Sequence, residues 1–594
     1  MLIHREQAQL PKERRELYDS AINTLLHSWD KEKELNNYEV LQYLKQDDLR
    51  WFMARLAYWM HTQGGLGHKE GGMLIERDTL LEQLSEYIQD ELGVKLREAE
   101  AEAKRFLDRI VRERAGLISH LGDGYYAFVH RTFQEYLTAE DICNRAKEQR
   151  EIEPLLKEIH SHLHNPHWHE VILLLVAQLN GNKAAKVIET ILNNNSEYEQ
   201  WLYRDLLLAG RCLAEYPKCL RQKEENAKLV TEILTRLVKL ETTDGLRVGR
   251  KTKQLIPEIL LNLSGTIFAE EAIQLIKYYA SPINDSNRIL IYRLALGDHQ
   301  EAVTNIFNLL KNKYFFEQTL NMLNTVVKYS NISDFLIQQL CSEFHGELGI
   351  AKGLRQLGYH DEYVDLTLID DDYDEYWNDM AYEAHLQGEI EEAASIYSKI
   401  ETLLSELRNN SEAAIDKLLR DWLDYEDYGV GEYVAKKLGE ASSTYRLIEL
   451  KLLEKLQDKS FWEYGNTILA LGYLINPSQD IIDTLVSLLQ NHEDKIVCVS
   501  AAKALIQLDI YHKIVLSQLL NLFRNPNRFD DFYEQDLSFN SQVFEALVQL
   551  GKTFDGVAPA LSQWIEQHQD KEYLVNGIDA LWTLVEGSTT SYER

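Results

Sequence analysis

Proline and glycine are scarce in this chain of 594 residues, which contains only 9 prolines and 29 glycines. All-β proteins need turn residues every few positions, so this scarcity argues against an all-β fold and favours long helices. Cysteine is scarce as well, because the five cysteines are scattered and include no CxxC pair. We therefore expect reduced thiols, without a disulfide framework or a cysteine-based zinc site.

Positive charge is also in deficit, since 63 Lys and Arg residues face 95 Asp and Glu residues and leave a formal net charge of -32. Proteins that bind nucleic acid use Lys and Arg to displace counterions from phosphate. The negative net charge of this chain therefore argues against a nucleic-acid partner. The longest apolar run, 171–177, is far too short to span a bilayer, and the N-terminus lacks a signal-peptide apolar stretch. We therefore expect a cytoplasmic protein with neither a membrane nor a nucleic-acid partner.

The sequence shows the periodicity of helices. The chain is also too long for one compact core. Apolar residues recur at helical spacing in the segments 10–29, 49–61, 77–92 and 97–112. Two short β-prone runs, 116–121 and 125–129, then flank a Gly-Asp-Gly turn and predict a β-hairpin. Helices followed by one hairpin predict a winged helix over 36–142.

One string in this region carries a family resemblance. The segment 128–139 reads FVHRTFQEYLTA, and it follows LPKERRELY, LLHSWD and RAGLI at 10–18, 25–30 and 114–118. Together with 166–172 and 208–215, these segments resemble the tail of bacterial NACHT NTPases of the NLR-like STAND class over roughly 1–220. The winged-helix motif residues of the string are Phe128, His130, Thr132, Phe133, Glu135 and Tyr136.

The resemblance implies a domain order and a role for one histidine. It makes 1–35 the end of the helical domain behind the ATPase core, 36–142 the winged helix, and 143–220 a following helical region. In that family the histidine of the string touches the nucleotide phosphate in the closed, ADP-bound state, and its counterpart here is His130. The alternative is that His130 only caps or packs within the winged helix.

The rest of the chain predicts helical repeats. The segment 377–394 resembles a tetratricopeptide unit, and 494–505 resembles a HEAT repeat in which an Asp starts a helix. We divide this part into helical repeats over 221–440, with one tetratricopeptide-like unit near 377–400, and HEAT-like repeats over 441–594. A single helix pair cannot bury its apolar face alone, so stacking is expected. The predicted fold class is all-α, with a winged helix and then an irregular α-solenoid.

The chemistry of NTP hydrolysis is missing. No GxxxxGK[ST] string occurs, and the nearest match, 245–252, has its glycines one residue too close. We expect no catalytic residues and no cofactor, with ATP or ADP bound only through a missing or separate P-loop core chain. The histidines at 160–169 and the acidic run 370–375 lack the spacing of a metal site, so no metal is expected.

These observations predict a non-catalytic sensor or scaffold portion of a NACHT-type NTPase, acting in signalling or antiviral defence. Its repeat surface would bind a ligand or a protein partner. The chain begins inside what would be the helical domain, so it would be the sensor half of a split NTPase or a truncated one. Two alternatives stay open: a stand-alone HEAT-repeat adaptor, and an enzyme such as a solenoid-type lyase.

Overall fold

The computed structural model describes most of the chain in segments. These are 13–36, 41–62, 74–107, 117–148, 152–215, 220, 224–242, 247–264, 266–279, 395–407, 412–423, 430–442, 445–457, 464–523, 535–571 and 573–591. Two compact units divide the chain: unit 1 contains 1–243 and 252–332, and unit 2 contains 244–251 and 333–594. The predicted tetratricopeptide-like unit falls almost wholly outside the described residues, as does the acidic run 370–375.

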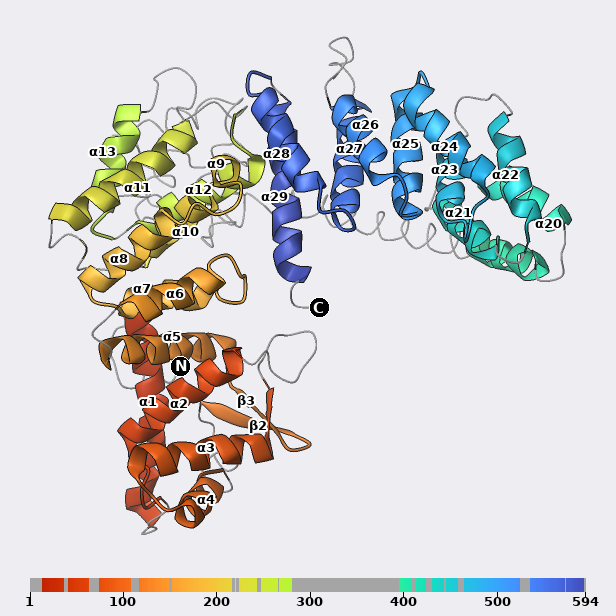
Figure 1. Cartoon of the computed structure of the whole chain (residues 1–594). Helices are drawn as coiled ribbons and strands as arrows, with labels where there is room; N and C mark the ends of the chain where they lie inside the picture. Colours follow the sequence, from red (N-terminus) through yellow and green to blue (C-terminus); the bar gives the residue numbers. More distant parts are fainter. Residues whose placement is uncertain are drawn as a thin grey trace, which may run out of the picture. The chain divides into compact units, whose positions relative to one another are not determined.

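Unit 1 begins with helices and a small sheet that lies beside α2 and α3 (Figure 1). Its first elements are α1 (Arg14–Asn36), α2 (Gln46–Thr62), β1 (Leu74–Glu76), α3 (Arg77–Leu92), α4 (Leu96–Arg105), β2 (Ile118–Gly122), β3 (Tyr125–Phe128) and α5 (Arg131–Glu148). Helices α2 and α5 share the most extensive contact in this part of the chain. Phe52, Met53 and Leu56 of α2 are buried in the core.

The sheet has three antiparallel strands in the order β1-β3-β2, where the sequence predicts only a hairpin. The predicted hairpin is present as β2 and β3, and its turn runs through Gly122, Asp123 and Gly124, all with positive φ. Strand β1 adds three residues to the other edge of β3, with Leu74 opposite Ala127. A strand of three residues is too short to leave a period-two signal in the sequence.

Polar side chains fix how the first helices meet. Arg50 of α2 donates two hydrogen bonds to Glu140 of α5, at 2.7 and 2.9 Å, and others to Asp19 and Asn23 of α1. The buried carboxylate of Glu102 on α4 accepts backbone N–H bonds from 42–44, just before α2. These contacts join α1, α2, α4 and α5 into one domain.

The rest of unit 1, where the structure describes it, is helical. Its described elements are α6 (Glu153–His162), α7 (His169–Gln178), α8 (Gly181–Leu192), α9 (Glu199–Leu202), α10 (Arg204–Ala214), α11 (Glu224–Thr242), α12 (Arg250–Asn262) and α13 (Ala269–Tyr279). Helix α7 packs against α5, and every residue of 171–177 is buried. The apolar run therefore belongs to the core. The sequence of the basic segment 247–253 suggests a solvated loop between helices, but the segment is helical from Arg250 onward.

Unit 2 is an array of helices in two layers (Figure 1). Its described elements include α20 (Glu412–Lys417), the π-helix η5 (Leu418–Trp422), α21 (Val430–Ala441), α22 (Leu447–Gln457), α23 (Tyr464–Gly472), α24 (Gln479–Asn491), α25 (Lys495–Gln507), α26 (His512–Leu522), α27 (Gln535–Gly551), α28 (Val557–Gln567) and α29 (Leu574–Ser591). The odd-numbered helices from α21 to α29 contact one another in succession, and α24, α26 and α28 form a second row. This alternation is the arrangement of an α-solenoid.

The HEAT-like segment 494–505 forms α25 as the sequence predicts. The Asp494 side chain caps this helix by accepting a hydrogen bond of 2.9 Å from the backbone N–H of Ile496. The sequence also predicts a missing inter-repeat contact, because Cys498 stands where such repeats often have Arg. Cys498 is buried, and its thiol contacts the backbone carbonyl oxygens of Leu488 and His492, on and just after α24.

Candidate nucleotide-sensing site at the start of α5

The predicted motif lies where β3 ends and α5 begins. The backbone N–H of Val129 donates to the Leu117 carbonyl, which holds this junction against β2. Helix α5 then starts at Arg131, so His130 occupies the position directly before the helix. The first-turn N–H groups of a helix have no intrahelical acceptor and carry the positive end of the helix dipole, which suits an anionic ligand.

The structure divides the six motif residues into two groups. Phe128, Glu135 and Tyr136 are buried, and Phe133 is half-buried against the Tyr18 ring of α1. His130 and Thr132 are exposed. The first group therefore stabilises the domain, and only the second can contact a ligand.

His130 makes one aromatic contact within the chain. Its ring meets the Phe133 ring edge-on, with the centroids 5.8 Å apart. Its imidazole is otherwise exposed at the domain surface. This placement leaves the exposed side of the ring open to a ligand, and the contact with Phe133 is equally compatible with packing within the winged helix.

Arg131 is held by two neighbours. Its guanidinium donates to the Glu135 carboxylate one helical turn later, at 2.9 Å, and contacts Nδ1 of His167 at 3.2 Å. Burial raises the pKa of Glu135, although the Arg131 charge acts in the opposite direction. Arg131 thus joins α5 to the loop before α7.

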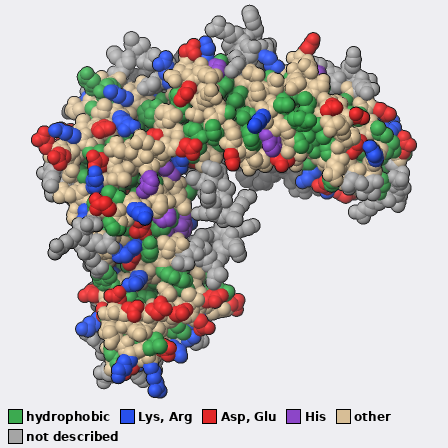
Figure 2. Space-filling model, in the orientation of Figure 1, with side chains coloured by type: hydrophobic (Ala, Val, Ile, Leu, Met, Phe, Trp, Pro, Cys, Tyr) green, Lys and Arg blue, Asp and Glu red, His purple; other side chains and the backbone are tan. Residues whose placement is uncertain are grey.

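The histidines at 160–169 have separate roles. Figure 2 shows histidine side chains grouped on one face of unit 1. His162 stacks on Trp168, His167 stacks on His61, His169 contacts Arg211, and His160 contacts Asn194. Among the residues that the structure describes, no three His, Cys, Asp or Glu side chains converge as a possible metal site. Trp168 is buried and anchors this loop in the core.

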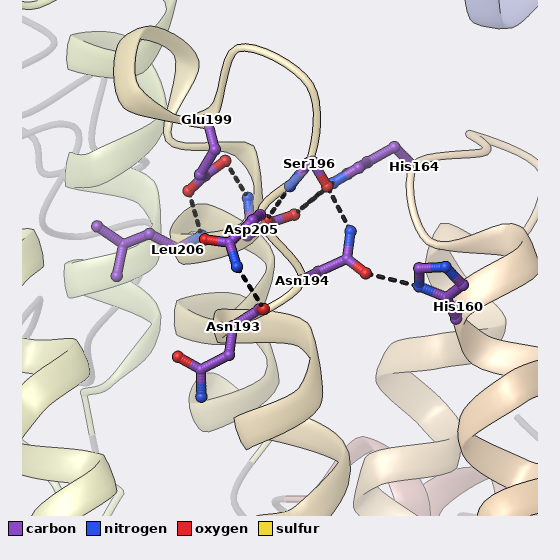
Figure 3. Close-up of polar contacts among 9 residues, drawn as sticks. His160, His164, Asn193, Asn194, Ser196, Glu199, Asp205 and Leu206 are labelled. Carbon is purple, nitrogen blue, oxygen red and sulfur yellow. Dashed lines mark hydrogen bonds and ion pairs between the residues drawn. The ribbon is translucent and has the colours of Figure 1, made fainter.

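A Ser-His-Asp cluster that the sequence does not reveal lies between α8 and α10 (Figure 3). Nε2 of His164 lies 2.9 Å from Oγ of Ser196 and 2.7 Å from Oδ1 of Asp205. Ser196 also donates its hydroxyl proton to Asp205, at 2.5 Å, and its backbone N–H to the same carboxylate. No sequence spacing could have identified it, because the three residues come from different loops and helices.

The geometry of this cluster does not match a catalytic triad. In a triad the histidine contacts the serine through one ring nitrogen and the aspartate through the other. Here the same histidine nitrogen faces both partners, and the serine hydroxyl donates its hydrogen bond to the carboxylate instead of to the histidine. Burial opposes ionisation of Asp205, but hydrogen bonds from His164 and Ser196 outweigh it and lower its pKa. The cluster stabilises a loop, in which Glu199 also caps α10 through the N–H groups of Asp205 and Leu206.

The segment 245–252, the nearest match to a phosphate-binding loop in the sequence, lies partly within α12. Thr252, the hydroxyl residue of that string, is buried and contacts the carbonyl of Leu202 at 3.3 Å. Such a hydroxyl is not placed to coordinate a metal ion bound to a nucleotide. Within the described ranges, no helix is long and apolar enough to cross a membrane.

Comparison with known proteins bears on the first part of unit 1. No curated protein matches the chain. An engineered protein of known structure is 15% identical to this chain. The alignment covers 74% of this chain and 99% of the engineered protein, with a TM-score of 0.18. UNC-45 from Drosophila melanogaster is also 15% identical to this chain. The alignment covers 96% of this chain and 80% of UNC-45, with a TM-score of 0.22. Both scores are low, so neither structure informs the fold.

A family match is confined to the domain that carries the motif. Residues 14–142 match the family described as winged helix-turn-helix domain C-terminal to NACHT. The matched range runs from the first residue of α1 into α5 and contains the whole three-stranded sheet. Residues 14–142 are thus similar to a NACHT-associated C-terminal region.

Proposed function

We propose that this chain is the non-catalytic sensor and scaffold portion of a NACHT-type NTPase. The observation that carries the proposal is the family match over 14–142, within which His130 lies exposed at the start of α5. A P-loop core, in the same polypeptide or in a separate chain, would supply nucleotide binding and hydrolysis. Here the winged helix would report the state of that nucleotide.

His130 would contact a phosphate of the nucleotide. Its exposed imidazole and the first-turn N–H groups of α5 offer hydrogen-bond donors to an anion, and the helix dipole favours negative charge there. Arg131 connects this position to His167 before α7, so movement at His130 would reach the helices that follow. The His130 contact would therefore couple nucleotide state to the position of the winged helix.

The helical array of unit 2 would provide the recognition surface. Stacked helix pairs present a long surface for a ligand or a protein partner. In this proposal a bound trigger acts on the winged helix, and the response is signalling or antiviral defence. The odd-numbered layer from α21 to α29 is the continuous face on which such a partner could bind.

Calorimetry with ATP and ADP tests the proposal. The purified chain is titrated alone and then mixed with a P-loop protein encoded beside it, using wild type and the His130→Ala variant. We expect binding only in the mixture, and weaker ADP binding in the variant by about tenfold, the effect of losing one hydrogen bond to a charged group. His120→Ala, which removes another exposed histidine of the same domain, is the matched control.

The outcomes separate the alternatives. Binding by the mixture that is unchanged in His130→Ala would retain the NTPase assembly but remove the sensing role of His130. No binding in either sample would leave the stand-alone adaptor. Tight binding by the chain alone would overturn the non-catalytic assignment.

A further inference from the structure

A cavity of about 420 Å³ lies between α2 and α3, away from His130 and the proposed nucleotide contact. It is lined by Phe52, Arg55, Leu56, Tyr58, Trp59 and Thr62 of α2 and by Gln83, Glu86, Tyr87 and Asp90 of α3. This volume lies within the range of small-molecule sites in proteins. The mixture of aromatic and acidic side chains around it narrows the kind of ligand that it can hold.

The floor of the cavity is aromatic. The rings of Phe52 and Tyr87 contact each other with centroids 5.5 Å apart, and both side chains are buried. Trp59, half-buried, adds an indole to the wall. The Tyr58 ring already has the Arg145 guanidinium 4.0 Å from its centroid. The faces of aromatic rings attract cations, and the effect is largest for tryptophan.

The rim of the cavity has an excess of negative charge. Glu86 and Asp90 lie one helical turn apart on α3, and no described cation lies within ion-pair distance of either carboxylate. The cation on the wall, Arg55, is paired with Glu91 at 2.8 Å. Figure 2 shows acidic side chains in a band over the region where Figure 1 places α3. Two carboxylates at the cavity are therefore left without a counter-charge.

A tyrosine hydroxyl adds a polar group to the cavity. Tyr87 is only 8% exposed and lines the cavity, yet no described residue forms a hydrogen bond with its hydroxyl. Burial, with the nearby charges of Asp48 and Glu91, raises the pKa of Tyr87, so the hydroxyl stays neutral. The hydroxyl is therefore available to accept a hydrogen bond from a ligand in the cavity.

We propose that this cavity binds an organic cation, an ammonium or guanidinium group on a short apolar stem. The stem would lie on Phe52, Leu56 and Tyr87, and the charged head would meet Glu86 and Asp90 beside the Trp59 indole. Such a cation would offset one of the two negative charges at the rim and cover the aromatic floor at once. Anionic ligands, nucleotides among them, are repelled by the same rim. The site is thus separate in chemistry from the nucleotide contact at His130.

Saturation-transfer NMR on the full chain tests the site with three probes. The free cations are n-butylammonium and agmatine, and the third probe is a short blocked peptide containing one lysine. Neutral n-butanol controls for the apolar stem. We expect the cations to bind and n-butanol to bind at least about tenfold more weakly, because it lacks the charge that pairs with the rim.

Two sets of variants locate the binding. In the double variant Glu86→Gln/Asp90→Asn, cation affinity should fall by about tenfold or more, while Glu82→Gln, an exposed acid on the same helix outside the cavity, should bind as wild type. Trp59→Leu should weaken the cations but not n-butanol. Binding of the free amines points to a small-molecule ligand, and binding of the peptide alone to a lysine of a partner protein.

Clear results would overturn the proposal. Cation binding that is equal in wild type and in the double variant would place the site elsewhere. Binding of n-butanol as tight as that of n-butylammonium would reduce the cavity to an apolar pocket. Absence of binding by every probe would remove the site. None of these results depends on the nucleotide experiment, so the two proposals fail separately.

Discussion

His61 shows how a single side chain at the end of α2 depends on its surroundings. Its ring is 3% exposed, stacks on His167 with centroids 3.8 Å apart, and meets Trp168 edge-on. Its Nε2 has no hydrogen-bond partner among the residues that the structure describes. Burial, with the charges of His167 and Arg131, lowers the pKa of His61 to about 3. The folded protein therefore keeps this imidazole neutral at a pH where an unfolded chain would protonate it.

Replacing His61 by Phe should change how stability depends on pH. Below the unfolded pKa of about 6.5, wild type loses unfolding free energy at up to about 1.4 kcal/mol per pH unit through this residue. The Phe variant keeps the ring stack without a titrating group. Urea unfolding followed between about pH 7 and about pH 5.5 should show that the unfolding free energy of the variant rises relative to that of wild type as the pH falls.

The control for this measurement is His120→Phe, which replaces an exposed histidine on β2. Its stability should follow wild type across the whole range. If the unfolding free energies of His61→Phe and wild type change equally with pH, His61 does not resist protonation in the folded state.

At the scale of the elements, close helix crossings in unit 2 depend on small residues. A Cβ added to Gly472 of α23 would lie 2.8 Å from Cα of Ala504 on α25 and 3.1 Å from its Cβ. Both positions are buried. A backbone atom cannot turn aside as a flexible side chain can, so the two helices would have to move apart. The contact between α23 and α25 is among the most extensive in unit 2.

Gly472→Ala should therefore destabilise unit 2 by about 1–3 kcal/mol, the usual range for overpacking a tight core. Gly465→Ala is the matched control on the same helix, because a Cβ there would meet nothing within 4 Å. The control should be neutral or stabilise by up to about 1 kcal/mol, since alanine favours the helix. Urea denaturation followed by circular dichroism measures both, and equal midpoints for the two variants would refute the crossing argument.

At the scale of the whole molecule, charge decides which macromolecules can approach. A winged helix is a common DNA-binding element, but this chain has a formal net charge of -32. Binding to duplex DNA gains most of its free energy from counterions released by Lys and Arg. The surface potential of this chain opposes that exchange.

We expect no binding to duplex DNA by fluorescence anisotropy, at physiological ionic strength or at lower salt. Lower salt strengthens an attractive electrostatic contact, so it would expose even a weak one. A basic winged-helix protein serves as the positive control. Binding that weakens as salt is raised would show that a local basic patch, such as 247–253, overrides the net charge.

The sequence alone settled most of the helical architecture. Apolar spacing predicted α3 at its observed bounds and α2 within three residues, because an amphipathic helix repeats its pattern over many residues. The predicted segment 10–29 overlaps α1 but ends seven residues before α1 does. It also placed the β2–β3 hairpin, since a Gly-Asp-Gly turn with positive φ requires glycine-rich sequence. The string at 128–139 identified the winged helix, and the match over 14–142 agrees with it.

Tertiary structure decided what each motif residue can do. The sequence could not separate exposed His130 from buried Glu135 and Tyr136, because all six residues carry equal weight in the string. Nor could it find β1, the cluster of His164 with Ser196 and Asp205, or the cavity between α2 and α3. Each of these joins residues that are distant along the chain, and only folding brings them together. Local periodicity determined the elements, and long-range packing determined the sites.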